Sequence, residues 1–276
     1  MRGIKIIAVT LMVICTALLA LPYGVTYFIF RPTPLDRPDP HEWGLHEAKQ
    51  ITFRAIAGAR LSGWWQPPPT LEAPVVLLVH GSSANISTRA TIAQRLARDG
   101  FGALLFDYRG YGHSEGKPSE NGINEDALSA YDWLMSEGIS PSNVIILGQS
   151  LGNVPATRLA ATRPSAGLIL VSPFTNAQGV IADRVGWPLF GVLPWPRNKF
   201  DVGLNLNHVM VPIAFVVSNA DGVVPLENSR KLATLSPTPV HWFEDDHFVH
   251  QGLLAGVAAS GALTQALASV VEKKPH

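Results

Sequence analysis

The feature that most constrains the fold of this chain is a series of short apolar runs separated by segments with helical periodicity. Residues 75–79 read VVLLV, a continuous run typical of a strand buried on both faces of a parallel sheet. Similar runs predict strands at 102–107, 144–147, 168–171, 213–217 and 240–243, and helical spacing predicts helices at 88–99, 123–136, 151–162 and 253–271. Alternating strands and helices predict an α/β fold, with a mostly parallel central sheet and helices on both faces.

Composition divides the chain into three parts. Residues 1–30 are mostly apolar, residues 31–50 begin RPTPLDRPDP and predict an extended Pro-rich spacer, and residues 51–276 suit one large domain. That domain opens with a predicted hairpin, 51–57 and 59–65, which turns at Gly58. Hydrophobic residues are 47% and charged residues 15% of the chain, which excludes a disordered protein.

Charge and cysteine content exclude several kinds of partner. The 21 basic residues balance 21 acidic ones without a basic run, so nucleic acid is not an expected partner. The single cysteine, Cys15, lies in the apolar N-terminal part, so the domain has no internal disulfide and no thiolate metal site. We expect no metal and no organic cofactor, and the sequence does not indicate an oligomeric state.

Residues 1–30 predict an N-terminal transmembrane anchor. Arg2 and Lys5 begin the chain, and residues 6–30 carry no charge, a length sufficient for the roughly 20 apolar residues that cross a bilayer as a helix. The alternatives are a cleaved signal peptide, whose cleavage signal this stretch matches poorly, and a buried helix. The two cations favour a cytoplasmic N-terminus, and basic residues beyond the segment weaken that preference. The resulting hypothesis is a single-pass membrane protein with an extracytoplasmic domain.

A serine lies on a tight bend directly after one of the predicted buried strands. Residues 144–153 read VIILGQSLGN, so Ser150 stands in a G-x-S-x-G motif between a strand and a helix. A nucleophile elbow has this context, because the glycines leave room for neighbouring backbone around a strained serine. The motif alone is weak, since a serine in this place also suits a helix N-cap.

A serine nucleophile needs a base, and the base needs an acid to hold its tautomer. Asp221 follows the predicted strand 213–217, and His247 follows the strand 240–243. Carboxyl ends of parallel strands build the site of an open α/β sheet, so these two side chains are the predicted acid and base. His250 is the alternative base, and an Asx turn is the alternative role of Asp221.

The tetrahedral intermediate of acyl transfer needs hydrogen-bond donors for its oxyanion. The backbone N–H of Leu151, directly after the serine, is one candidate donor, and the N–H of Ser82 in the turn 80–83 is the other. We expect the His80 imidazole to hold this turn in place rather than to take part in the chemistry. Asp245 and Asp246 are expected to form a solvated turn.

Four stretches, LLVHGSS, FDYRGYGHSEG, ILGQSLG and the pair SNADGVVP with DDHF, occur in an order that resembles the α/β-hydrolase superfamily. The likeness is to its serine aminopeptidase-like and monoacylglycerol-lipase-like branch. It implies an α/β-hydrolase fold in which Ser150, Asp221 and His247 form the catalytic triad. The stretch 107–116 resembles a structural turn of the family, without a catalytic role for Asp107 or Arg109.

Two features of the chain bear on how far this resemblance extends. Many members of the family have a second glycine after the elbow, where this chain has Asn153, and this difference concerns efficiency more than mechanism. Residues 173–208 exceed the length that the core connection needs and resemble a lid insertion; the apolar stretch 186–196 suits either acyl binding or ordinary packing.

The predicted function is hydrolysis of a carboxylic ester or thioester near a membrane, through an acyl-enzyme on Ser150, with a lipid-like or other small acyl substrate. Peptide hydrolysis is the alternative within the enzyme class, and a catalytically weak binding protein is the alternative outside it. Neither the acyl length nor the preference among ester, thioester and amide follows from the sequence.

Overall fold

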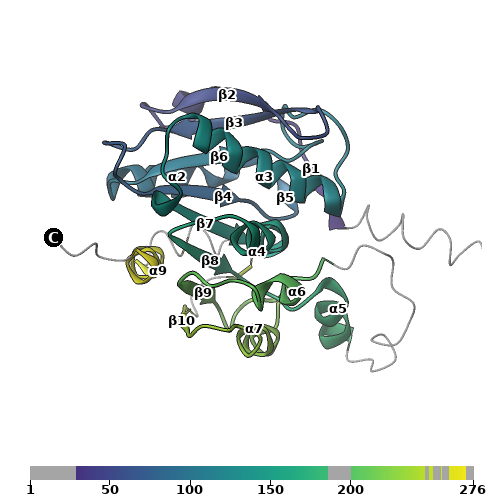
Figure 1. The fold of residues 1–276 in the computed structure, drawn as a ribbon. Helices are drawn as coiled ribbons and strands as arrows, with labels where there is room; N and C mark the ends of the chain where they lie inside the picture. Colours follow the sequence, from purple (N-terminus) through teal and green to yellow (C-terminus); the bar gives the residue numbers. More distant parts are fainter. Residues whose placement is uncertain (1–28, 186–199, 246–248, 251–255, 257–260, 272–276) are drawn as a thin grey trace, which may run out of the picture.

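The computed structural model describes residues 29–185, 200–245, 249–250, 256 and 261–271. Within them, eight strands form one sheet (Figure 1). In spatial order these are β10 (Val240–Glu244), β9 (Ile213–Val217), β8 (Gly167–Val171), β7 (Val144–Gln149), β4 (Val75–Val79), β6 (Gly102–Phe106), β3 (Arg60–Gln66) and β2 (Lys49–Arg54). Neighbours from β6 to β10 are parallel, while β3 is antiparallel to both β6 and β2. This confirms the mostly parallel sheet and the hairpin around Gly58.

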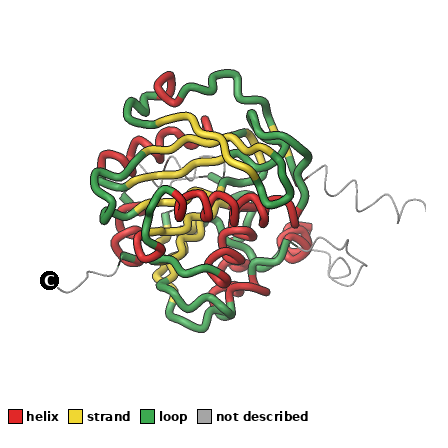
Figure 2. The backbone as a smooth tube through the Cα atoms, turned by 45° about the horizontal axis from the view of Figure 1, so that its top comes forward, coloured by secondary structure: helices red, strands yellow, loops and turns green. Residues whose placement is uncertain are grey.

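Helices cover both faces of the sheet, because side chains on a strand point alternately to opposite sides. On β4, Val75, Leu77 and Val79 belong to one buried cluster, and Val76 and Leu78 belong to another. The first cluster includes residues of α3 (Glu120–Ser136), α4 (Asn153–Thr162) and α6 (Gly203–Leu206); the second includes residues of α2 (Ala90–Arg98) and α9 (Ala262–Val270) (Figures 1 and 2). Of the helix predicted at 253–271, α9 is the described C-terminal part, and residues 253–255 and 257–260 lie outside the described residues.

The predicted Pro-rich spacer lies against the domain. Its first two residues form β1 (Arg31–Pro32), which pairs in parallel with β5 (Ser83–Ala84), directly after the turn that follows β4. Further along, η1 (Pro40–Trp43) forms a short helical turn, and Leu35 and Leu45 are buried. The sequence did not indicate these contacts, because prolines and charges in this stretch suppress any periodic pattern.

The predicted anchor at 1–30 lies almost wholly outside the described residues. None of the helices in the described part of the chain is long and apolar enough to span a bilayer. Phe30, the second described residue, is buried, and its ring packs edge-on against Phe200 with ring centroids 5.7 Å apart.

The insertion at 173–208 contains α5 (Ala177–Val185) and α6, and residues 186–199 between them lie outside the described part. Both of its ends are held. An isolated bridge joins Asn176 to Asp201, and the backbone N–H of Phe200 donates to Glu120 Oε1 at 2.9 Å. The apolar stretch 186–196, for which the sequence suits either acyl binding or ordinary packing, lies outside the described residues. Another helix on this side of the molecule, α7 (Leu226–Ala233), follows the loop after β9, and its Leu232 belongs to the same buried cluster as residues of α6.

Candidate active site

Ser150 lies at the sharp turn between β7 and α4, as the motif predicts. Its φ of 50° is left-handed, a conformation that is unfavourable for a residue with a Cβ and that occurs mainly where surrounding structure enforces it. The two flanking glycines are required by close approach. A Cβ on Gly148 would lie 2.8 Å from the side chain of Ala156, and one on Gly152 would collide with the backbone carbonyls of Val79 and His80.

The Ser150 hydroxyl is joined to Asp221 through an imidazole. His250 Nε2 lies 3.0 Å from Ser150 Oγ, and His250 Nδ1 lies 2.8 Å from Asp221 Oδ2. A carboxylate can only accept, so Nδ1 carries the proton and Nε2 is free to accept from the serine hydroxyl. This is the arrangement in which an imidazole can remove the serine proton.

The imidazole between Ser150 and Asp221 belongs to His250, which corrects the prediction of His247. His247 itself lies outside the described residues. The prediction took the histidine closer to the strand end; β10 ends at Glu244, and His250 stands six positions beyond that end, where no local sequence pattern distinguishes the two histidines. Asp245, expected on a solvated turn, is buried, and its N–H donates to Val217 O; Asp246 lies outside the described residues.

Asp221 lies in the loop after β9, and its carboxylate is well supplied with donors. Burial alone would raise its pKa, but the hydrogen bonds and charge of His250, the Val224 N–H and the Ser172 hydroxyl outweigh burial and lower the pKa below the ordinary value. The Asp221 carboxyl group is therefore ionised at neutral pH and can accept the hydrogen bond that orients His250. Ser172 was not singled out from the sequence, although a polar residue at the carboxyl end of a buried strand was a usable signal.

The turn after β4 lies beside Ser150 and is held by hydrogen bonds to three successive carbonyls. A Cβ on Gly81 would lie 3.5 Å from Ser150 Cβ, which brings this turn next to the nucleophile. The His80 carbonyl accepts from Tyr108 Oη, and the Gly81 carbonyl lies 2.7 Å from His80 Nδ1. The Ser82 carbonyl accepts from both Tyr111 Oη and the Arg31 N–H. The prediction of a structural turn at 107–116 did not include this role of Tyr108 and Tyr111, whose hydroxyls support the turn after β4.

The His80 contact also orients the Ser82 N–H. A carbonyl only accepts, so His80 Nδ1 donates to Gly81 O, and in a trans peptide the Ser82 N–H points the opposite way from that carbonyl. Full burial, followed by the charge of Arg89, lowers the pKa of His80 to about 3, so the ring stays neutral. This agrees with the expectation that His80 holds the turn.

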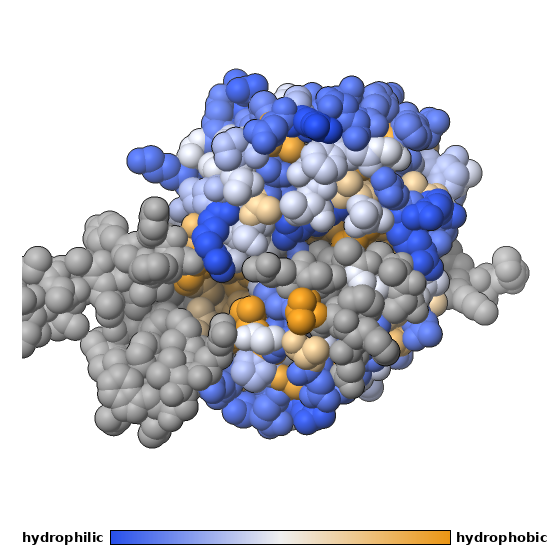
Figure 3. Space-filling view, turned by 180° about the vertical axis from the view of Figure 1, so that it is seen from behind, coloured by the Kyte–Doolittle hydropathy of each residue, from blue (hydrophilic) through white to orange (hydrophobic). Residues whose placement is uncertain are grey.

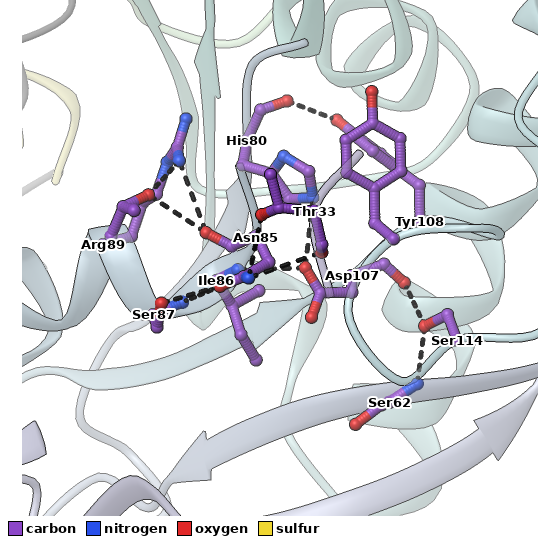
Figure 4. Close-up of polar contacts among 12 residues, drawn as sticks. Thr33, Ser62, His80, Asn85, Ile86, Ser87, Arg89, Asp107, Tyr108 and Ser114 are labelled. Atoms are coloured by element: carbon purple, nitrogen blue, oxygen red, sulfur yellow. Dashed lines mark hydrogen bonds and ion pairs between the residues drawn. The ribbon is translucent and has the colours of Figure 1, made fainter. Parts of the chain in front are cut away.

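Behind the turn, His80 meets a buried carboxyl (Figure 4). His80 Nε2 lies 3.7 Å from Asp107 Oδ1, which accepts from the Ile86 N–H. Burial raises the pKa of Asp107 to about 7. Arg89, also buried, donates to Gln149 Oε1 directly before the nucleophile. Arg109 instead pairs with Asp126 and Glu125, away from these groups, so it is a structural residue.

The surface seen from behind is polar over the half that carries β2 and β3, and hydrophobic residues gather lower down (Figure 3). In the part of the chain that the structure describes, no group of three or more His, Cys, Asp or Glu side chains is arranged to hold a metal ion.

A parallel sheet with a G-x-S-x-G elbow, and with an acid and a histidine on loops after later strands, defines the class of α/β hydrolases. Comparison with known proteins agrees. Residues 72–202 match the family model described as serine aminopeptidase, S33. An uncharacterised Mycobacterium tuberculosis protein, Rv2307c, is 34% identical over 200 residues, covering 71% of this chain and 69% of that protein. The chain belongs to the α/β-hydrolase superfamily.

Other relatives carry functional names. The lysophosphatidylserine lipase ABHD12 of Danio rerio is 29% identical over 246 residues, covering 76% of this chain and 64% of that protein. Among solved structures, an α/β hydrolase from Vibrio vulnificus superposes with a TM-score of 0.67 at 26% identity, covering 83% of each chain. An esterase from Pyrococcus furiosus superposes with a TM-score of 0.66 at 18% identity, covering 85% of this chain and 97% of that one, which shows the shared fold.

Proposed function

We propose that this α/β hydrolase cleaves carboxylic ester or thioester bonds through a covalent acyl-enzyme on Ser150. The observation that carries the proposal is the hydrogen-bonded chain from Ser150 Oγ through His250 to Asp221, with contacts of 3.0 and 2.8 Å. A serine hydroxyl at a helix cap would not require an imidazole and a carboxylate aligned behind it.

In the proposed reaction His250 Nε2 removes the proton from Ser150 Oγ as the oxygen attacks the substrate carbonyl carbon. Asp221 holds the ring and stabilises the imidazolium that forms. The N–H groups of Leu151 and Ser82 donate to the oxyanion, and His250 returns the proton to the leaving oxygen or sulfur. Water then attacks the acyl-enzyme by the same route and releases the acid and Ser150. Each step uses only groups of this chain and water.

The proposed substrate is an acyl ester with a lipid-like chain. Support comes from the relative named as a lysophosphatidylserine lipase and from the insertion at 173–208, which carries an apolar sequence. The N-terminal segment adds support, because a membrane-anchored hydrolase has lipid substrates close by. The proposed location is a single-pass membrane protein with the domain outside the cytoplasm, on the basis of the uncharged stretch 6–30 that follows Arg2 and Lys5. Alkaline extraction of cell membranes should leave the full chain in the pellet, and its release would contradict the anchor.

The first test is hydrolysis of p-nitrophenyl esters of increasing acyl length by the full chain in detergent, beside Ser150→Ala. We expect hydrolysis by the wild type, a loss of at least about 10⁴-fold in kcat/KM in the variant, and a preference for longer acyl chains. Matched anilides test the peptidase alternative. Amide cleavage as fast as ester cleavage would favour a peptidase, and folded protein without any hydrolysis would favour a binding protein.

A further inference from the structure

A second serine contacts the acid that orients His250. Ser172 directly follows β8, is 3% exposed, and has a φ of 48°, the left-handed conformation that a non-glycine residue adopts at a cost. The turn away from the strand brings its hydroxyl to Asp221, where Oγ donates to Oδ2 at 2.7 Å. This is the same oxygen that contacts His250 Nδ1.

The four hydrogen bonds to Asp221 fix which oxygen faces the histidine. Oδ1 accepts from the N–H groups of Val223 and Val224 at 2.8 and 2.9 Å. Oδ2 accepts from Ser172 and His250. A carboxylate has about four acceptor sites, so the two oxygens are both occupied and the group cannot turn without losing a donor. Without the Ser172 hydroxyl, the His250 imidazole would be the one remaining donor of the two that Oδ2 has here.

Asn153 connects this arrangement to the nucleophile. It lies in the first turn of α4, three positions after Ser150, and its side chain is fully buried. Its Nδ2 donates to the carbonyls of Val171 and Ser172, at 3.0 and 3.2 Å. The amide therefore ties the helix that follows the elbow to the backbone that carries the Ser172 hydroxyl. A glycine, which the family resemblance suggested for this position, could not make these contacts.

We propose that Ser172 is a positioning residue for Asp221, and that Asn153 in turn positions Ser172, so that the acid and the nucleophile are held in register through one line of hydrogen bonds. This inference rests on the proposed function. Ser172 and Asn153 do not touch the reacting atoms; they act through Asp221 and His250.

The decisive experiment compares Ser172→Ala with Ser229→Ala in the full chain. Ser229 is a matched control, because its hydroxyl is also buried and donates to the carbonyl of Pro173, one residue from Ser172, instead of to Asp221. Both variants lose one buried hydroxyl and one hydrogen bond. The readouts are kcat/KM for p-nitrophenyl butyrate and the rate of labelling by a fluorophosphonate probe, each measured from pH 5 to 9.

For Ser172→Ala we expect both rates to fall about tenfold at pH 8. The acidic limb of both profiles should also move upward by roughly half a pH unit, because a carboxylate that loses a donor is a stronger base and favours the protonated form of the Asp221–His250 pair. The titratable group that contacts this carboxylate is His250, so the acidic limb of each profile reports Asp221 and His250 together. Ser229→Ala should retain the wild-type limb. A limb that does not rise in Ser172→Ala, or that rises equally in both variants, overturns the inference.

Asn153→Ala and the double variant test the second link. Asn153→Ala should shift the limb in the same direction by a smaller amount, and the double variant should be no slower than Ser172→Ala, because both changes act on one contact. Multiplying losses would show that Asn153 acts independently, and would overturn its assigned role. Failure of the proposed function is distinguishable: wild-type protein would then neither hydrolyse the ester nor be labelled at Ser150.

Discussion

At the scale of single residues, the two ring nitrogens of His250 determine what substitutions at the site should do. One nitrogen accepts from Ser150 and the other donates to Asp221, and both contacts cross the fold, since Ser150 and His250 lie 100 positions apart. An alanine at His250 leaves the serine without a base. Because the three groups act as a unit, loss of any one of them should remove most of the rate.

His250→Ala should therefore lower kcat/KM for p-nitrophenyl esters by about 10⁴-fold or more. His247→Ala is the informative comparison, because the histidine closer to β10 was the sequence-based prediction, and its variant should stay within about threefold of the wild type. Circular dichroism would establish that both variants are folded. A large loss in His247→Ala with an active His250→Ala would reverse the assignment.

At the scale of elements, β1 connects the N-terminal part of the chain to the turn beside Ser150. The Arg31 N–H donates to Ser82 O at 2.9 Å, and Asn85, just beyond β5, donates from Nδ2 to the Pro34 carbonyl at 2.7 Å. Residues directly after the predicted anchor thus help to hold the carbonyl of one oxyanion-hole residue. An element of two residues has no periodic signal, so no sequence pattern could have indicated this pairing.

Arg31→Pro tests this connection, since proline removes the one N–H that Arg31 donates to Ser82. We expect kcat to fall roughly 2- to 10-fold, with little change in KM, because the oxyanion donors matter most in the transition state. Arg37→Pro is the matched control: it makes the same Arg-Pro to Pro-Pro change in the same segment. Equal kinetics in the two variants would contradict a role for β1.

At the scale of the whole molecule, the buried pair His80 and Asp107 makes opposing contributions to the pH dependence of stability. Burial, with a smaller effect of Arg89, lowers the pKa of His80 to about 3, so this group makes the protein more stable as pH rises from about 3 to about 6.5. Burial raises the pKa of Asp107 to about 7, so this group makes the protein less stable as pH rises from about 4 to about 7. Between about pH 4 and 6.5 the two slopes oppose each other.

Asp107→Asn should expose the His80 contribution while keeping an oxygen acceptor for the Ile86 N–H. Between pH 4.5 and 6.0, the free energy of unfolding of this variant should rise by about 2 kcal/mol more than that of the wild type. Urea titrations of the full chain in detergent at the two pH values would measure it. Asp132→Asn, at an exposed carboxylate, should reproduce the wild-type change. A variant Asp107→Asn that also matches the wild type would refute the opposed pair.

The amino-acid sequence by itself determined the buried strands, the elbow at Ser150 and the loop that carries Asp221, because each depends on neighbouring residues: apolar runs, glycines at a tight turn, and a polar residue at a strand end. Only the tertiary structure decided that His250 meets Ser150, and that Ser172 and Asn153 support the acid. Those contacts join loops and strands far apart in the chain, where the position of a side chain follows from packing across the molecule.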